Sequence, residues 1–166
     1  MTTSEIQLLA KVAWKENRGG GSDGMQSVIN VVLNRVGHRN YPDSIEGVIM
    51  QPSQFTSMSV KSDPEYSLDP VTAKLNAADA QAWQEAQRLA VLAAGGNLED
   101  VTLGSTLYYA PAGIQTHRTI TLPTGENIPW PQTWNQAVVQ YRATIQHQVF
   151  FAEVGARRFF CAAKEV

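Results

Sequence analysis

The spacing of hydrophobic residues changes near residue 100, and this change limits the chain to folds in which helices come first and strands follow. Before it, apolar residues recur every three or four positions over 4–16, 24–36 and 77–94, which predicts three amphipathic helices. After it, apolar and polar residues alternate over 139–145, which predicts a half-buried strand. Helices followed by strands are typical of the α+β class.

Polar residues and glycines mark the ends of the first two predicted helices. Ser4, with Gln7 three residues later, fits a capping box for the first helix. The glycine run 19–21 is expected to end that helix, and Ser22 or Asp23 to cap the next one. The two helices are therefore expected to be joined by a tight, glycine-rich connection.

A short helix and a long loop are expected in the middle of the chain. Asp43 is a candidate cap for a helix that runs to Ile49. Residues 51–69 are rich in Pro, Ser and Asp and predict a loop. Because long loops in compact domains are often functional, this segment is a candidate part of a site.

The last third of the chain predicts a small antiparallel sheet. Residues 102–109 are a candidate strand, and 149–154 a candidate hairpin partner for 139–145. Four prolines within 110–135 argue against regular structure over most of that span. The sequence has neither an internal repeat nor a linker, so residues 1–166 are expected to form one domain.

Charge and cysteine content exclude several classes of function. The chain has 13 Lys+Arg against 15 Asp+Glu, which argues against a nucleic-acid-binding surface. It contains no apolar run long enough to cross a bilayer, so stable membrane association is not expected. A single cysteine, Cys161, excludes an internal disulfide and a Cys-based zinc site, and a buried small apolar residue is its expected state.

The polar character of the chain comes from amides and hydroxyls, because only 17% of its residues are charged. Such a surface suits a neutral polar ligand such as a sugar, although an ordinary soluble surface is the alternative. Nucleotide-binding, zinc-protease and serine-hydrolase motifs are absent. His38, His117 and His147 lie far apart in the sequence, so neither a metal nor a cofactor is expected.

Glu16 is a charged residue at a position where the helix pattern predicts an apolar one. It continues the apolar face of the first predicted helix and lies at the C-terminal end of that helix. Partial burial and the negative end of the helix dipole both disfavour the carboxylate and raise its pKa. A carboxyl group that is protonated near neutral pH suits general acid catalysis. The alternative is a frayed helix end, with Glu16 in water and loosely paired to Lys15 or Arg18.

Six segments, taken together and in order, resemble the cell-wall hydrolase family of the spore-cortex-lytic enzyme SleB. The Glu-Asn-Arg-Gly at the end of the first helix is similar to the family's Glu-Ala-Arg-Gly-Glu. The runs Val-Leu-Asn-Arg-Val, Ile-Glu-Gly-Val-Ile and Gln-Phe-Thr form a specific set, although each alone is weak. The matching segments are 8–19, 26–36, 41–49, 51–56, 107–109 and 145–151.

The resemblance implies a mainly helical lysozyme- or lytic-transglycosylase-like fold with a small antiparallel sheet. It also implies cleavage of peptidoglycan between N-acetylmuramic acid and N-acetylglucosamine, with Glu16 at the position of the family's catalytic glutamate. Asn17 and Gly20 stand where the family has Ala and a second Glu, so the mouth of the cleft is expected to differ. Gln146 precedes His147 where the family motif has glycine, which puts a direct role for His147 in doubt.

The expected mechanism needs one carboxyl group. Glu16 protonates the leaving oxygen and then accepts the proton of the sugar's own C6 hydroxyl, which attacks C1 and leaves a 1,6-anhydro end. A hydrolase needs a second carboxylate about 5–5.5 Å away if retaining or about 6.5–9.5 Å if inverting. The sequence does not place any of four candidates there: Asp23, Asp43, Glu46 or Asp63. A hydrolytic muramidase and a non-catalytic glycan-binding module remain the alternatives.

Substrate-binding residues are expected in two further segments. Gln54, Phe55 and Thr56 begin the long loop, where Gln54 or Thr56 can bond to an N-acetyl group or orient the acid. One of Tyr108 and Tyr109 is expected to face inward, where it can stack on a sugar ring or bond near the acid. The alternatives are a core anchor for Phe55 and ordinary packing for the tyrosines.

Other residues have a less definite place. His147 is kept among the candidate substrate-binding residues because it belongs to the last matching segment. Asn34 and Arg35 are expected to be structural. Trp130 and Trp134 are expected to be sugar platforms or a lid, with a hydrophobic plug as the alternative.

The sequence as written starts without a secretion signal, whereas the expected substrate lies outside the cytoplasm. This combination predicts a phage endolysin that is made in the host cytoplasm, leaves through a holin pore and acts in the periplasm. A trimmed catalytic domain of a longer secreted enzyme is the alternative. The glycan strands of peptidoglycan are the expected partner, and the chain is expected to be a monomer.

Overall fold

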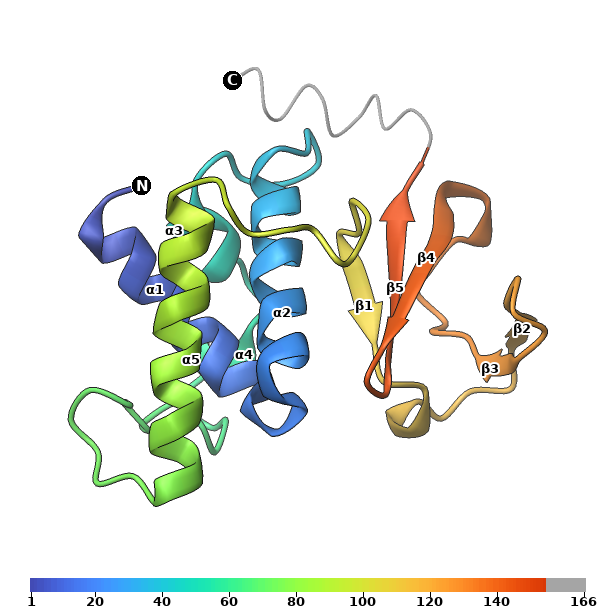
Figure 1. Ribbon diagram of the computed structural model, residues 1–166. Coiled ribbons are helices and arrows are strands. Elements are labelled where there is room, and N and C mark those ends of the chain that lie inside the picture. The colour runs from blue at the N-terminus through green and yellow to red at the C-terminus, as the bar shows by residue number, and fades with distance from the viewer. Residues whose placement is uncertain (155–166) are drawn as a thin grey trace.

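The computed structural model describes residues 1–154, in which a group of helices packs beside a three-stranded sheet (Figure 1). Cys161 lies outside the described residues. The architecture is the predicted α+β class, mainly helical with a small antiparallel sheet. The helices are α1 (Thr3–Asn17), η1 (Arg18–Gly20), α2 (Gly21–Val36), α3 (Ile45–Ile49), α4 (Thr56–Ser59), α5 (Ala77–Ala94), η2 (Pro111–Gly113) and η3 (Gln136–Val138). The strands are β1 (Leu107–Tyr109), β2 (Thr119–Thr121), β3 (Asn127–Pro129), β4 (Val139–Ile145) and β5 (Gln148–Glu153).

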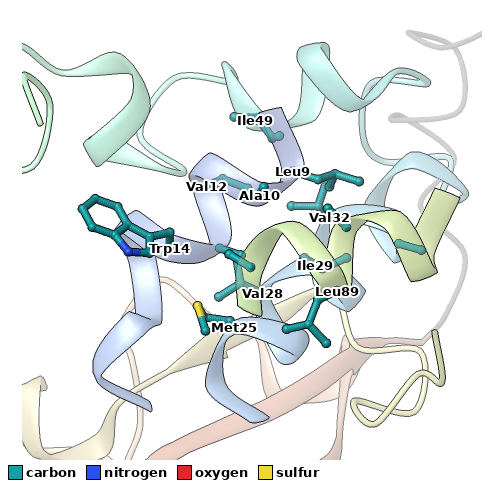
Figure 2. Packing of buried hydrophobic residues seen from close by; sticks show 14 of the residues in the cluster. Leu9, Ala10, Val12, Trp14, Met25, Val28, Ile29, Val32, Ile49 and Leu89 are labelled. Carbon is teal, nitrogen blue, oxygen red and sulfur yellow. The ribbon is translucent and has the colours of Figure 1, made fainter. Parts of the chain in front are cut away.

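The main core forms where α1, α2 and α5 pack together (Figure 2). The apolar faces predicted for these helices are the faces that are buried. Trp14 anchors the end of α1, because its ring meets that of Trp83 edge-on at 6.4 Å and its Nε1 donates to the carbonyl of Asp79 at 3.0 Å. The last turn of α1 is therefore held against α5.

No helix within residues 1–154 combines the length and hydropathy needed to cross a bilayer.

The capping box of α1 lies two residues before the predicted one. The amide of Glu5 donates to Oγ1 of Thr2 at 3.1 Å, and the amide of Thr2 donates to Oε2 of Glu5 at 2.7 Å. Ser4 and Gln7 were expected to fill these roles, and that prediction was wrong. Both pairs have the required spacing, but a carboxylate side chain is a stronger acceptor than the amide of Gln7.

Two other predicted caps were also wrong. The helix α2 starts directly after η1, so Gly20 is its N-cap and neither Ser22 nor Asp23 caps it. At α3, Ser44 is the N-cap instead of Asp43, and its Oγ accepts from the amide of Gly47 at 3.0 Å. By contrast, the long helix α5 has the bounds that the sequence predicts.

The sheet has the strand order β1-β5-β4, and both neighbouring pairs are antiparallel. The predicted strand 139–145 and its hairpin partner are confirmed, whereas β1 is only the last three residues of the predicted strand 102–109. The tight turn uses Gln146 with φ 56°, a left-handed conformation that usually favours Gly or Asn. The central strand β5 is buried on both faces: Phe150 stacks on Tyr108 on one face, and Val149 and Phe151 join a second core on the other.

The proline-rich segment 110–135 is irregular over most of its length, as predicted, and its regular elements are short. It contains the hairpin of β2 and β3, which the prolines do not interrupt because Pro123 lies outside both strands and Pro129 is the last residue of β3. Trp130 is 1% exposed and its Nε1 donates to the carbonyl of Trp134 at 3.0 Å. Trp130 is therefore part of a hydrophobic plug, not a sugar platform. The second core consists of Tyr109, Leu122, Ile128, Trp130, Val149 and Phe151.

The long segment after α3 contains α4 and is fastened to one face of α1. Lys11, Lys15 and Arg18 lie on that face because they are spaced by four and three residues. The segment therefore covers the end of α1 that carries Glu16. Lys11 pairs with Asp69 at 3.4 Å, and Arg18 pairs with Glu65 at 2.7 Å. Lys15 donates to the carbonyl oxygens of Ser57 and Tyr66 at 3.3 and 3.0 Å.

Candidate active site

Glu16 lies in the last turn of α1 and its side chain is partly buried. Burial is the largest influence on this carboxyl group, and it raises the pKa above the ordinary value. The negative charges of Asp63 and Glu65 raise the pKa further, whereas a hydrogen bond from Ser57 and the charge of Lys15 oppose the rise. The predicted direction of the pKa shift is confirmed, with burial as the main cause.

The alternative of a frayed helix end does not hold, because Arg18 has other partners. Its Nη1 and Nη2 donate to the two carboxylate oxygens of Glu65 at 2.7 and 3.0 Å, and its Nε donates to Asp79 at 3.1 Å. Its guanidinium also lies 4.2 Å from the centre of the Trp14 ring. Arg18 therefore joins α1, the long loop and α5 beside Glu16 instead of neutralising it.

Ser57 is the residue that contacts the acid, because its hydroxyl donates a hydrogen bond to Oε1 of Glu16. The sequence assigned this role to Gln54 or Thr56. In α4, however, consecutive side chains point about 100° apart. Thr56 faces outward and donates to Asp63 at 2.6 Å, whereas Ser57 faces inward and is 3% exposed. Two adjacent hydroxyls in the sequence were a signal for this contact, but they do not indicate which one points toward the acid.

The two tyrosines of β1 point to opposite sides of the sheet. Tyr109 belongs to the second core, where its hydroxyl donates to the carbonyl of Pro129 at 2.6 Å and burial raises its pKa to about 12. Tyr108 lies on the side of the helices, with its ring centre 5.4 Å from that of Phe150. Burial raises the pKa of Tyr108, and the charge of Glu16 raises it further. Tyr108 is thus the tyrosine near the acid.

Two grooves lie near the acid. Glu16 itself lines a groove of about 620 Å³ between the end of α1 and the start of α5. A second groove, of about 350 Å³, is lined by Tyr108, whose pKa the charge of Glu16 raises. Of the predicted substrate-binding residues, Gln54, Phe55 and Tyr108 line the second groove, together with Trp134, whereas Thr56, Tyr109 and His147 line neither. The remaining residues of the second groove are Arg35, Ser53 and Leu107.

The turn between β4 and β5 reaches the end of α1 through Gln148. His147 is exposed in this turn. The next side chain, Gln148, points the other way, and its Oε1 accepts from Nδ2 of Asn17 at 3.0 Å. The residue of this segment that the fold brings next to the acid's helix is therefore Gln148, which the sequence did not single out.

The two departures from the family pattern are sterically linked. A Cβ atom on Gly20 would lie 2.6 Å from Oδ1 of Asn17, and one on Gly24 would lie 2.7 Å from Nδ2 of Asn17. The amide of Asn17 therefore occupies the space that a side chain at position 20 would need. With the Asn17 side chain in this place, a Cβ atom at position 20 does not fit without a shift of Asn17.

This packing predicts non-additive effects of two substitutions. Gly20→Ala is expected to destabilise the protein by about 1–2 kcal/mol, because its methyl group displaces the Asn17 amide from Gln148. In an Asn17→Ala background the same change is expected to be neutral or stabilising, since Gly20 has φ −82° and alanine fits there without strain. Urea unfolding of both single variants and the double variant measures the coupling. Strictly additive free energies of unfolding would contradict the steric link.

The described residues offer acid–base chemistry without a metal site. Within residues 1–154, His, Cys, Asp and Glu side chains do not gather in a group of three that could hold a cation. What the site presents is a carboxyl group with a raised pKa, one hydroxyl donor and an open groove. Such a carboxyl group can donate a proton to the leaving oxygen of a bound ligand and later accept one.

The sequence profile of the family described as Cell Wall Hydrolase matches residues 19–151, a range that begins just after Glu16. The chain is also similar to the spore cortex-lytic enzymes of Halalkalibacterium halodurans (32% identical over 65% of this chain) and Oceanobacillus iheyensis (38% identical over 34% of this chain). It spans only 28% and 20% of the lengths of these two relatives.

Two solved structures have a similar fold. One is the catalytic domain of the germination-specific lytic transglycosylase SleB from Bacillus anthracis, with a TM-score of 0.57 and 22% identity over 90% of this chain and 95% of that one. The other is the catalytic domain of the Bacillus cereus SleB protein, with a TM-score of 0.56 and 22% identity over 90% of this chain and 91% of that one. At 22% identity, these two matches show that the folds are similar and no more.

Proposed function

Because the chain belongs to the Cell Wall Hydrolase family, we propose that it is a lytic transglycosylase that cleaves the glycan strands of peptidoglycan, with Glu16 as the catalytic acid. The bond cleaved is the β-1,4 bond between N-acetylmuramic acid and N-acetylglucosamine. The observation that carries the proposal is Glu16 itself: a partly buried carboxyl group with a raised pKa, bonded to Ser57 and open to a groove.

In the proposed reaction, Glu16 acts twice. As a carboxylic acid it donates its proton to the glycosidic oxygen that leaves C1 of the N-acetylmuramic acid. As a carboxylate it then removes the proton of the C6 hydroxyl of the same sugar, and the C6 oxygen bonds to C1. The product has a 1,6-anhydro end, the proton balance closes on Glu16, and water is not consumed. The intramolecular attack has a large proximity advantage over attack by water.

The carboxylates near Glu16 support a mechanism with a single catalytic carboxyl group. Glu65 is held by the two nitrogens of Arg18 and is not available for catalysis. Asp63 accepts hydrogen bonds from Thr56 and from the amide of Glu65, and these bonds hold its pKa below the usual range. These two hydrogen bonds tie Asp63 into the fold of its own loop.

Hydrolysis is the second candidate, and Asp63 is the observation that favours it. Of the four carboxylates considered from the sequence, Asp63 is the one whose charge raises the pKa of Glu16. An ionised carboxylate in this position can activate a water molecule on the far side of the bond. A muramidase would then use the same acid with a different nucleophile.

Mass spectrometry of the fragments released from purified peptidoglycan tests the proposal. We expect products with 1,6-anhydro-muramyl ends, each lighter by one water than the corresponding reducing-end fragment. The Asp63→Asn variant should form the same anhydro products. Reducing ends in the wild type, lost in Asp63→Asn, would instead establish the muramidase. Intact glycan in the presence of folded protein would identify a glycan-binding module.

We propose that the second groove holds a sugar beside the acid. Nη1 of Arg35 donates to Oε1 of Gln54 at 2.9 Å, which fixes this amide and leaves its NH₂ group to donate to an N-acetyl carbonyl. Tyr108 and Trp134 supply aromatic surface for the sugar ring, and Phe55 supports the wall from within, since it is 2% exposed.

The biological setting is a separate proposal. We propose a monomeric phage endolysin that meets its substrate in the periplasm, because peptidoglycan lies there in bacteria with an outer membrane. Expression of the chain in such a host, with and without a co-expressed holin, tests this setting. Lysis is expected only when the holin is present, and lysis without it would contradict holin-dependent release.

A further inference from the structure

We propose that Ser57 is a positioning residue for the acid: its hydroxyl engages Oε1 of Glu16, so that Oε2 is the oxygen that carries and delivers the proton. This inference rests on the proposed function and deepens it. A serine hydroxyl has a single hydrogen to donate, and the acceptor within hydrogen-bond distance of Oγ of Ser57 is Oε1 of Glu16. A protonated carboxyl group has one accepting oxygen and one O–H, so an Oε1 that accepts from Ser57 places the acidic hydrogen on Oε2.

Hydrogen bonds of Ser57 and of the neighbouring Thr56 fix the backbone that carries the Ser57 hydroxyl. Ser57 is 3% exposed, and its carbonyl oxygen accepts from Nζ of Lys15 at 3.3 Å. The preceding residue, Thr56, is tied to Asp63 at 2.6 Å, and its carbonyl accepts from the amide of Val60 at 2.8 Å. Because α4 is fixed at these points, the direction of the Ser57 hydroxyl is set before any substrate binds.

Charged and titratable groups from three elements act on Glu16. Lys15 lies on α1 itself and favours the carboxylate. Asp63 and Glu65, on the long loop, favour the protonated form, although the guanidinium of Arg18 neutralises Glu65. Tyr108, on β1, is neutral at ordinary pH because burial and Glu16 both raise its pKa. Ser57 and Asp63 therefore push the protonation of Glu16 in opposite directions.

The same hydrogen bond has a use in both halves of the proposed reaction. In the first half, Oε2 gives its proton to the leaving oxygen while Oε1 stays bonded to Ser57. In the second half, the Ser57 hydrogen bond stabilises the carboxylate that results, because hydrogen bonds to ionised acceptors are roughly twice as strong as neutral ones. Oε2 then accepts the proton of the C6 hydroxyl, and the hydrogen of Ser57 is never transferred.

The test is the pH dependence of the initial rate of fragment release from purified peptidoglycan at low substrate concentration. Ser57→Ala is expected to lower this rate about 10- to 100-fold, because the carboxyl group loses its fixed orientation. It should also move the alkaline limb of the profile to higher pH, since the lost hydrogen bond favoured the charged form. Asp63→Asn should move the same limb to lower pH, since it removes a negative charge near Glu16.

Matched variants separate positioning from folding. Ser59→Ala removes the other serine hydroxyl of α4, which donates to the carbonyl of Phe55 at 3.4 Å, and should leave the pH profile unchanged. Ser57→Thr keeps a hydroxyl and should restore most of the rate. If Ser57→Ala does not fold, Ser57→Cys replaces it, because a thiol is a weak donor of similar size and should give the same upward shift.

An unchanged alkaline limb in a folded Ser57→Ala or Ser57→Cys variant would overturn the inference, whether or not the rate falls. A loss of rate that is equal at every pH would point to a structural role only. The proposed function fails separately, through retention of activity in Glu16→Gln. If Glu16→Gln is inactive and the Ser57→Ala profile is not shifted, the role of Ser57 is rejected and the role of Glu16 as the acid is retained.

Discussion

Replacing Glu16 with glutamine is expected to reduce the release of soluble fragments from purified peptidoglycan by at least about 100-fold, with the fold unchanged. Glutamine has nearly the same shape as glutamate and can still accept the hydrogen bond from Ser57 through its Oε1. It has no acidic proton for the glycosidic oxygen, and its amide cannot act as the base for the C6 hydroxyl. The measurement is the initial rate of fragment release, with circular dichroism as the control for folding.

A Glu16→Gln variant that keeps more than about a tenth of the wild-type rate would exclude Glu16 as the general acid, since such catalysis is usually worth about 10²–10⁴-fold. For the wild type, the pKa of Glu16 also gives the sign of the pH dependence. The acid must be protonated when substrate binds, so the rate should fall as the pH rises through this raised pKa. The profile should show this limb at higher pH than an exposed glutamate would give.

The same substitution is expected to change stability in the opposite direction to activity. The pKa of Glu16 is raised in the folded state, so the folded protein holds this proton more tightly than the unfolded chain does. The stability that this provides is present at low pH and is lost as the pH rises through the folded-state pKa. Glu16→Gln should therefore be more stable than the wild type at neutral pH, and the difference should disappear in acid. Urea midpoints measured across this pH range check the prediction.

Replacing Arg35 with methionine is expected to destabilise the protein by about 3 kcal/mol or more. Arg35 is 4% exposed, and its Nε donates to the carbonyl of Thr106 at 2.7 Å and its Nη1 to Gln54 at 2.9 Å. Its guanidinium also lies 5.1 Å from the Tyr41 ring centre and 5.3 Å from that of Phe55. Methionine fills much of the space, but it leaves the buried carbonyl of Thr106 without its donor.

Urea unfolding monitored by tryptophan fluorescence measures this loss. Arg39→Met is the matched control, because Arg39 is exposed just beyond the same helix and its replacement should change the free energy of unfolding by no more than about 0.5 kcal/mol. Equal midpoints for the two variants would show that Arg35 does not join α2 to the segment before β1 in the way described. The structural role expected of Asn34 has a similar basis, since its Nδ2 lies 3.0–3.2 Å from Asp100, Thr102 and the carbonyl of Ser105.

Features with a local cause were predictable from the sequence. The helix over residues 77–94 and the strand over 139–145 have the predicted bounds, because hydrophobic period and glycine ends act over a few neighbouring residues. The raised pKa of Glu16 was predictable for the same reason, since a carboxyl group that continues the apolar face of a helix is partly buried wherever that face packs. The helix caps were less certain, because several nearby residues satisfied the same spacing.

The sequence by itself determined the α+β class and the main elements, and it singled out Glu16 as the candidate acid. Only the tertiary structure decided which side chains lie around Glu16. Ser57, which contacts Glu16, is 41 residues away in the sequence. Gln148, which contacts the neighbouring Asn17, is 131 residues away from Asn17. Local periodicity places a side chain on one face of its own element and carries no information on which distant element will cover that face. That choice is made by the packing of α1 against α5 and of the sheet beside α2, which a one-residue change in register would alter.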